Sequence, residues 1–332
     1  MGNWSRSWAV PSTSVTAQAR SRLGEQPMKL LYERTAAPLA TPGTPGSWLR
    51  GRRLMAIDPV QIDVPDTPAN FEEFGKYQGG TRRPFPQIHA VGLGEFGTHA
   101  VVAAELGTIY DGERKPARAL LGSIEQDMLV IADRGYYAFD LWQQFMTTGA
   151  SLLWRVAAGI KFPVLKILPD GSYISEVNNK KTRSGTYRIP LSAVTDPRDA
   201  THIPVRVIEY TVSGEDSENS ETFRIVTTIL DPQDANALEL AAAYQQRWEY
   251  EISLKEIETQ LLVSGRGLRS KSPEMIRQEW WGLLLAHYAV RALMAEAADT
   301  AYVDSDRLSF TRTLNIVRRQ VINQAAFSPR QT

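Results

Sequence analysis

The chain contains no cysteine, which excludes disulfide bonds and thiolate metal sites and makes a reducing cytosol the simplest setting. Histidine is scarce, and none of these residues has the close spacing of paired metal ligands. The histidines are His89, His99, His202 and His287. No run approaches the ~20 apolar residues of a membrane span, and the first residues lack the apolar core of a signal peptide. Secreted and membrane-spanning classes are therefore disfavoured.

Net positive charge is also absent, because 37 Lys and Arg residues balance 37 Asp and Glu residues. This balance counts mildly against a nucleic-acid-binding protein, although local patches matter more than the sum. The sequence does have a hydrophobic fraction of 43% over 332 residues, enough for a substantial core. That length allows one large domain or two to three smaller ones.

The most informative pattern of apolar and acidic residues lies at 128–137. Its first five residues are apolar, and Asp133 and then Gly135 follow them. Such a run predicts a short strand buried on both faces, ending on an acid before a tight turn. An acid at the carboxyl end of a central strand lies where α/β folds place their chemistry. The alternative is that Asp133 only hydrogen-bonds the turn or caps the next helix.

A second apolar strand, at residues 54–58, also ends on an acid, Asp58. The elements between and after these strands run strand, strand, helix and strand; they are predicted at 87–95, 98–106, 113–124 and 151–156. Three strands followed by alternating helices and strands indicate a mixed α/β sheet. We expect its antiparallel pairs first and its parallel neighbours later.

Residues 159–230 interrupt this α/β pattern. Alternating segments and a turn at Asp170-Gly171 predict a β-rich module, which we expect to lie outside the main sheet. Residues 235–262 then predict one long helix, and a basic loop with Arg266, Arg269 and Lys271 follows it. At the other end, residues 1–50 indicate two short helices, which either form a DNA-binding pair or serve plain packing.

One face of the predicted long helix has an unusual composition. At about 100° per residue, Tyr244, Arg247, Glu251 and Glu258 fall within a ~60° arc, and Lys255 lies one turn from Glu251. A phenol, a guanidinium and carboxylates on one stripe favour a functional face. The alternative is a ladder of ion pairs between residues i and i+4.

Three acids stand out from these patterns: Asp58, Asp133 and Glu251, called the acid triad below. Such a trio can hold two divalent cations, because Mg²⁺ prefers hard oxygen ligands. Two ions about 3.5–4 Å apart activate the attacking oxygen and stabilise the leaving one in phosphodiester chemistry. The combination therefore predicts a two-metal site.

The sequence resembles the DDE transposases of bacterial insertion sequences, in the branch with a Tyr-x2-Arg-x3-Glu-x6-Lys helix. The resemblance covers residues 10–323 approximately and rests on the motifs at 54–58, 63–68 and 132–136 and on Tyr244, Arg247 and Glu251. It implies a ribonuclease-H-like mixed sheet with flanking helices, interrupted by a β-rich insertion. The implied division is a helical end-binding segment at 1–50, truncated relative to related transposases, a first part of the core at 51–158, the insertion at 159–230, and a second part of the core at 231–325.

The resemblance also implies an activity. The acid triad would bind two Mg²⁺ or Mn²⁺ ions, and water and then a DNA 3′-hydroxyl would attack phosphodiesters at the transposon ends. Tyr244 and Arg247 would hold a phosphate near the cut. Further contacts to DNA are expected from Lys255, Arg266, Arg269 and Lys271. The implied partners are double-stranded DNA, as terminal inverted repeats and target, and a second copy in a DNA-bound homodimer in the bacterial cytoplasm, at the nucleoid.

Two residues depart from the family pattern. Pro59 follows the first aspartate, where the family usually has glycine, and Glu258 occupies the position of the motif lysine. The alternative function is a truncated or decayed copy that binds DNA or a full-length partner without transposing. A third possible function is that of a stand-alone nuclease built on the same core.

Overall fold

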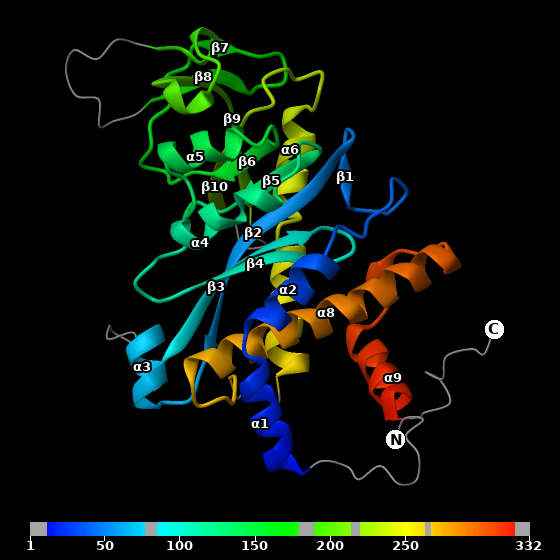
Figure 1. The fold of residues 1–332 in the computed structure, drawn as a ribbon. Coiled ribbons are helices and arrows are strands. Elements are labelled where there is room, and N and C mark those ends of the chain that lie inside the picture. Colours follow the sequence, from blue (N-terminus) through cyan, green and yellow to red (C-terminus); the bar gives the residue numbers. More distant parts are fainter. Residues whose placement is uncertain (1–11, 77–84, 179–188, 214–219, 263–266, 323–332) are drawn as a thin grey trace.

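The computed structural model describes residues 12–76, 85–178, 189–213, 220–262 and 267–322 (Figure 1). Its strands join in one mixed sheet, in the order β4-β3-β2-β5-β6-β10-β9-β8-β7, with β1 paired to β2. The strands are β1 (Trp48–Leu49), β2 (Arg52–Asp63), β3 (Gln87–Glu95), β4 (Val101–Gly107), β5 (Met128–Ala132), β6 (Ser151–Arg155), β7 (Lys166–Ile167), β8 (Tyr173–Asn178), β9 (His202–Ser213) and β10 (Ser220–Thr227).

Five strands form the centre of this sheet as the sequence predicts. Strands β2, β3 and β4 pair antiparallel, whereas β2, β5 and β6 pair parallel. The order 4-3-2-5-6 with this change of direction is the ribonuclease-H-like arrangement. The predicted mixed α/β sheet with flanking helices is confirmed.

The predicted position of the β-rich segment is wrong. Strand β10 pairs antiparallel with β6, through Ile225 opposite Arg155, and β9, β8 and β7 continue from it. These strands therefore extend the central sheet, at the top of Figure 1, instead of forming a module outside it. The physical reason is that β6 would otherwise present an unpaired edge of N–H and C=O groups. The division of the chain into four segments stays a prediction.

Helices cover both faces of the sheet. The longer ones are α1 (Thr13–Leu23), α2 (Gln26–Thr35), α3 (Pro68–Phe74), α4 (Arg114–Ala119), α5 (Phe139–Met146), α6 (Ala237–Gln245), α7 (Trp248–Glu256), α8 (Pro273–Ala301) and α9 (Phe310–Ile322). Short turns of helix are η1 (Leu120–Ser123), η2 (Leu191–Ala193), η3 (Pro197–Asp199), the π-helical η4 (Ile257–Leu261) and η5 (Ser305–Arg307). Within the described ranges no helix is long and apolar enough to cross a membrane.

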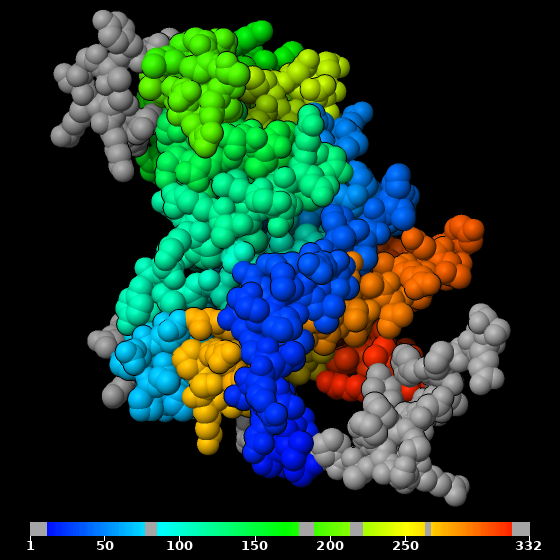
Figure 2. Space-filling view, viewed as in Figure 1, coloured from blue at the N-terminus to red at the C-terminus, as the bar shows by residue number. Residues whose placement is uncertain are grey.

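Alternation along β2 separates the two faces. Leu54, Ala56 and Val60 join the apolar cluster that includes residues of α7 and α8. Met55 and Ile57 join the cluster on the opposite face, which includes residues of α5. The space-filling view shows α1 and α2, in blue, beside α8, in orange (Figure 2). Asp58 has the same parity along β2 as the first three of these residues and therefore lies on the α7 face.

The predicted long helix is also corrected. It is broken between α6 and α7, where the N–H of Arg247 bonds the carbonyl of Tyr244, three residues back, instead of the carbonyl four back. After α7 the chain continues as a π-helical turn, η4. No glycine or proline marks either irregularity, so the 3.6-residue period alone does not reveal them.

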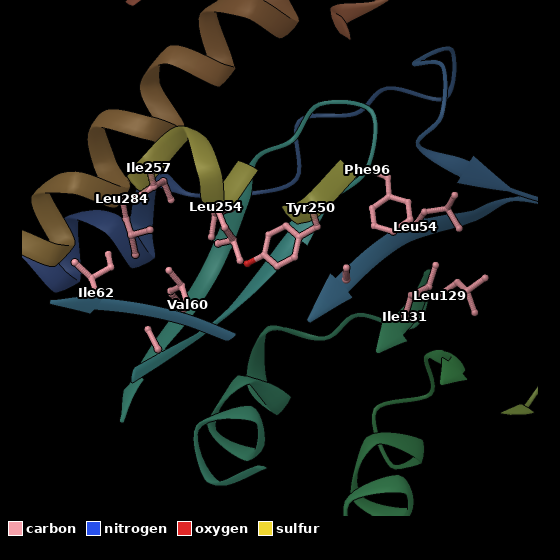
Figure 3. Close-up of a cluster of buried hydrophobic side chains, with 14 of the residues drawn as sticks. Leu54, Val60, Ile62, Phe96, Leu129, Ile131, Tyr250, Leu254, Ile257 and Leu284 are labelled. Atoms are coloured by element: carbon pink, nitrogen blue, oxygen red, sulfur yellow. The ribbon is translucent and has the colours of Figure 1, made fainter. Parts of the chain in front are cut away.

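Helix α7 approaches the sheet closely through one side chain. Tyr250 is fully buried, and Figure 3 shows its ring projecting from α7 among side chains of the sheet. A Cβ atom added to Gly92 or Gly94 of β3 would overlap this side chain. Glycine at these two positions is what lets α7 lie against the strands.

Pro59 lies within β2, opposite Val91 of β3. The N–H of Arg53 points towards β5, where it bonds the carbonyl of Asp127, and the unbroken register gives Pro59 the same direction. Pairing with β5 ends at Ile57, so the missing N–H of Pro59 faces no strand. Proline is therefore accommodated here without loss of a ladder hydrogen bond.

Candidate active site

The structure brings the acid triad together on one face of the sheet. Asp58 is on β2 with Val60 as its same-face neighbour, and Asp133 directly follows β5. Glu251 comes from α7. The Arg247 guanidinium links two of the acids: Nη1 is 3.1 Å from Asp58 Oδ2, and Nη2 is 2.6 Å from Glu251 Oε1.

Tyr244, on the last turn of α6, reaches the third acid. Its hydroxyl donates a hydrogen bond of 3.2 Å to Asp133 Oδ1. Burial, and next the Asp133 carboxylate, raise the pKa of this phenol, so it remains a donor. Two helical residues predicted to line the site, Tyr244 and Arg247, thus contact the triad directly, in spite of the break between their helices.

Asp58 has a perturbed acidity. Burial raises the pKa of this carboxyl to about 7, Arg247 opposes the rise, and the negative charges of Glu251 and Asp133 add to it. The site therefore holds more negative charge than its guanidinium balances, and a bound cation would relieve the excess.

A fourth acid, Glu113, was missed by the sequence analysis. It precedes α4, and burial followed by the charge of Asp133 raises the pKa of its carboxyl. A Cβ atom on Gly135 would lie 2.8 Å from Glu113 Oε2, so the glycine after the strand leaves room for this carboxylate. No motif marks Glu113, and its position is visible only once α4 is placed beside the end of β5.

Residues of the extended sheet also support the site. Arg155 of β6 lies over the Phe223 ring of β10 at 4.2 Å, and its Nη1 is 4.0 Å from Asp133 Oδ1. Phe223 in turn stacks on Tyr210 of β9 and contacts Tyr244, with ring centroids 5.4 Å and 6.2 Å away. The segment predicted as a separate module therefore packs against the residue that bonds Asp133.

The other described residues that were predicted to contact DNA lie on α7 and in the segment before α8. Lys255 is exposed on α7, while Arg247 is the ion-pair partner of Glu251. Arg269 and Lys271 are exposed before α8, and the backbone N–H of Arg269 bonds the Glu279 carboxylate. Arg266 lies outside the described residues.

Comparison with known proteins identifies the family. Residues 49–289 match the family described as the transposase DDE domain. The chain belongs to this family. The predicted relationship to DDE transposases of insertion sequences is thereby confirmed.

Two relatives come from Escherichia coli strain K12. Transposase InsG of insertion sequence element IS4 is 28% identical over 329 residues, covering 98% of this chain and 70% of that protein. The putative transposase InsZ is 27% identical over 147 residues, covering 44% of this chain and 49% of that protein. A solved structure, the piggyBac transposase synaptic complex with hairpin DNA, aligns at a TM-score of 0.49 and 7% identity over 88% of this chain and 56% of that one.

DDE transposases use divalent metal ions, and the acid triad offers donors that suit them. All three side chains present hard carboxylate oxygens, and the charges of Glu251 and Asp133 add to the rise that burial causes in the pKa of Asp58. The triad is nevertheless spread around Arg247. Among the described residues, the trio whose ligand atoms all lie within 4.8 Å of one another is a different one, His99, Glu249 and Asp306.

Proposed function

We propose that this DDE transposase cleaves DNA at the ends of an insertion sequence and transfers the resulting strand into target DNA. The observation that carries the proposal is the convergence of Asp58, Asp133 and Glu251, from β2, β5 and α7, around one guanidinium. In the proposal these acids hold two Mg²⁺ or Mn²⁺ ions. When bound, the cations would activate the attacking oxygen and stabilise the leaving one.

The chain's own residues have distinct roles in this scheme. Arg247 keeps Asp58 and Glu251 together before cations arrive, and a phosphate oxygen is the other anion its fork can bind. Tyr244 holds Asp133 by its hydroxyl and can donate to the same phosphate. The exposed cations Lys255, Arg269 and Lys271 would contact the DNA backbone further along.

The test incubates the purified chain with linear DNA carrying the ends of its own element, Mn²⁺ and a target plasmid. We expect cleavage at the ends and joined products. Asp133→Asn removes a carboxylate from the site and should lower the rate of cleavage at least about a thousandfold, since several kcal/mol of transition-state stabilisation depend on it. Asp140→Asn, the same change on the exposed start of α5, is the matched control and should leave the rate unchanged.

Two outcomes would contradict the proposal. End-specific binding without any cleavage in Mn²⁺ would favour the alternative, a copy that binds without transposing. Cleavage without joining, or without preference for the ends, would favour a nuclease. A dimer in the DNA complex is part of the proposal, and the mass of the complex measures it.

A further inference from the structure

A second group of polar side chains lies beside α7, away from the acid triad. This histidine cluster consists of His99, Glu249 and Asp306, from the turn between β3 and β4, the first turn of α7, and η5. One ligand atom from each lies within 4.8 Å of the others. His99 and Glu249 are buried, whereas Asp306 is exposed. The cluster therefore has a buried base and one side open to solvent.

The hydrogen bonds of His99 suit a metal ligand. Its Nδ1 lies 3.0 Å from the backbone oxygen of Glu249, which can only accept, so Nδ1 carries a hydrogen. Its Nε2 lies 2.6 Å from Asp306 Oδ1. Metal-bound histidines commonly donate their other ring N–H to a backbone carbonyl in this way, which aims the free nitrogen at the ion.

The surrounding backbone holds the three side chains in place. His99 has a φ of 59°, a left-handed conformation that is uncommon for residues other than glycine. The Gly97 N–H donates to Glu249 Oε2 over 3.1 Å, and Ser305 Oγ donates to the Gly97 carbonyl. The turn, α7 and η5 are thus joined around the cluster, and strained backbone of this kind is often found at functional sites.

We propose that the histidine cluster binds one divalent transition-metal ion of the Zn²⁺ or Mn²⁺ class, separate from the acid triad. One imidazole nitrogen with two carboxylates suits these ions, whereas Mg²⁺ prefers oxygen ligands alone. The ion takes the place of the hydrogen between His99 Nε2 and Asp306, and that proton leaves to solvent. The bound ion joins the β3–β4 turn and η5 to α7 through Glu249, which lies two residues before Glu251.

The test uses the full chain, stripped of metal by a chelator and reloaded with Mn²⁺. Pulsed electron paramagnetic resonance then reports whether nitrogen couples to bound manganese. The acid triad offers only oxygen, so nitrogen coupling marks the histidine cluster. Wild type and Asp58→Asn should both show it, and His99→Asn should lose it, since asparagine tolerates the left-handed backbone. His202→Asn, on β9, is the control and should retain the coupling.

Asp306→Asn gives an independent variant that removes one ligand from the exposed side of the cluster. The nitrogen-coupled site should lose at least tenfold in Mn²⁺ affinity. Coupling to oxygen alone in wild type, or a nitrogen signal unchanged in both cluster variants, would overturn the proposal. Because Asp58→Asn retains the nitrogen signal whether or not the chain cuts DNA, failure here is distinguishable from failure of the proposed activity.

Discussion

The acid triad and the histidine cluster both depend on α7 but present different environments. Glu249 and Glu251 are two residues apart, about 200° around a helix, so they face opposite directions. Glu251 and Asp133 keep 44% and 35% of their side chains exposed and Asp58 keeps 15%, whereas His99 keeps 3% and Asp306 keeps 50%. The two exposed carboxylates of the acid triad can reach a polymer substrate. A buried histidine between three segments instead suits a role in holding those segments together.

Displacing α7 from the sheet should disrupt both groups at once. Gly94→Ala places a methyl group where the Tyr250 ring lies, so either the ring or the helix must move. We expect a loss of about 3 kcal/mol in the free energy of unfolding, measured in urea, and loss of DNA cleavage. Gly122→Ala is the matched control, because nothing lies within 4 Å of its added Cβ. Equal stabilities of the two variants would show that Tyr250 does not position α7.

The pH dependence of stability should next distinguish the acid triad from the histidine cluster. The pKa of Asp58 is raised to about 7 in the folded chain, so the folded state holds a proton that the unfolded state releases near pH 4. The stability this proton contributes is present at low pH and is lost as the pH rises through 7. Between pH 5 and pH 8 the metal-free chain should lose about 2–3 kcal/mol from this carboxyl.

Comparison of variants isolates that contribution. Urea unfolding of the metal-free Asp58→Asn variant should show a shallower fall in stability between pH 5 and pH 8 than wild type. Asp140→Asn, which changes an exposed carboxyl, should keep the wild-type slope. Parallel profiles for wild type and Asp58→Asn would contradict the raised pKa of the Asp58 carboxyl.

Much of the central sheet followed from local patterns, because apolar runs that end on an acid are short-range features. The apolar runs at 54–58 and 128–132 were enough to predict the strands that carry or precede Asp58 and Asp133, and these strands pair parallel as β2 and β5. The partner of β6 was not predictable in the same way, since β10 is more than sixty residues away and pairing at an edge is non-local. Glu113 was missed because its place depends on Gly135 having no side chain.

The helix carrying Glu251 shows a second limit of sequence patterns. Arithmetic at 100° per residue grouped Tyr244, Arg247 and Glu251 correctly, even though a break separates the first from the others. It could not place Glu258 as well, because that residue lies in the π-helical η4, where each residue turns less than in an α-helix. The packing of α7 on the sheet decides where this helix face ends, and the helical period contains no information about that packing.

The smallest expected effect concerns Glu258, which stands at the motif position of a lysine. Its carboxylate is exposed at the end of the α7 face and would repel DNA phosphate there. Glu258→Lys replaces repulsion by attraction, and charge-assisted contacts are worth about 1.5–3 kcal/mol, so end-DNA should bind about tenfold tighter at low salt. Salt should shrink the gain.

The matched control for this change is Glu296→Lys, which alters net charge equally at an exposed position on α8. Binding of labelled end-DNA, titrated at two salt concentrations, measures both variants. A gain for Glu258→Lys alone places the DNA along α7, beyond the acid triad. Equal gains would reflect net charge only, and no gain at either salt would mean that the path of the DNA leaves the protein before it reaches η4.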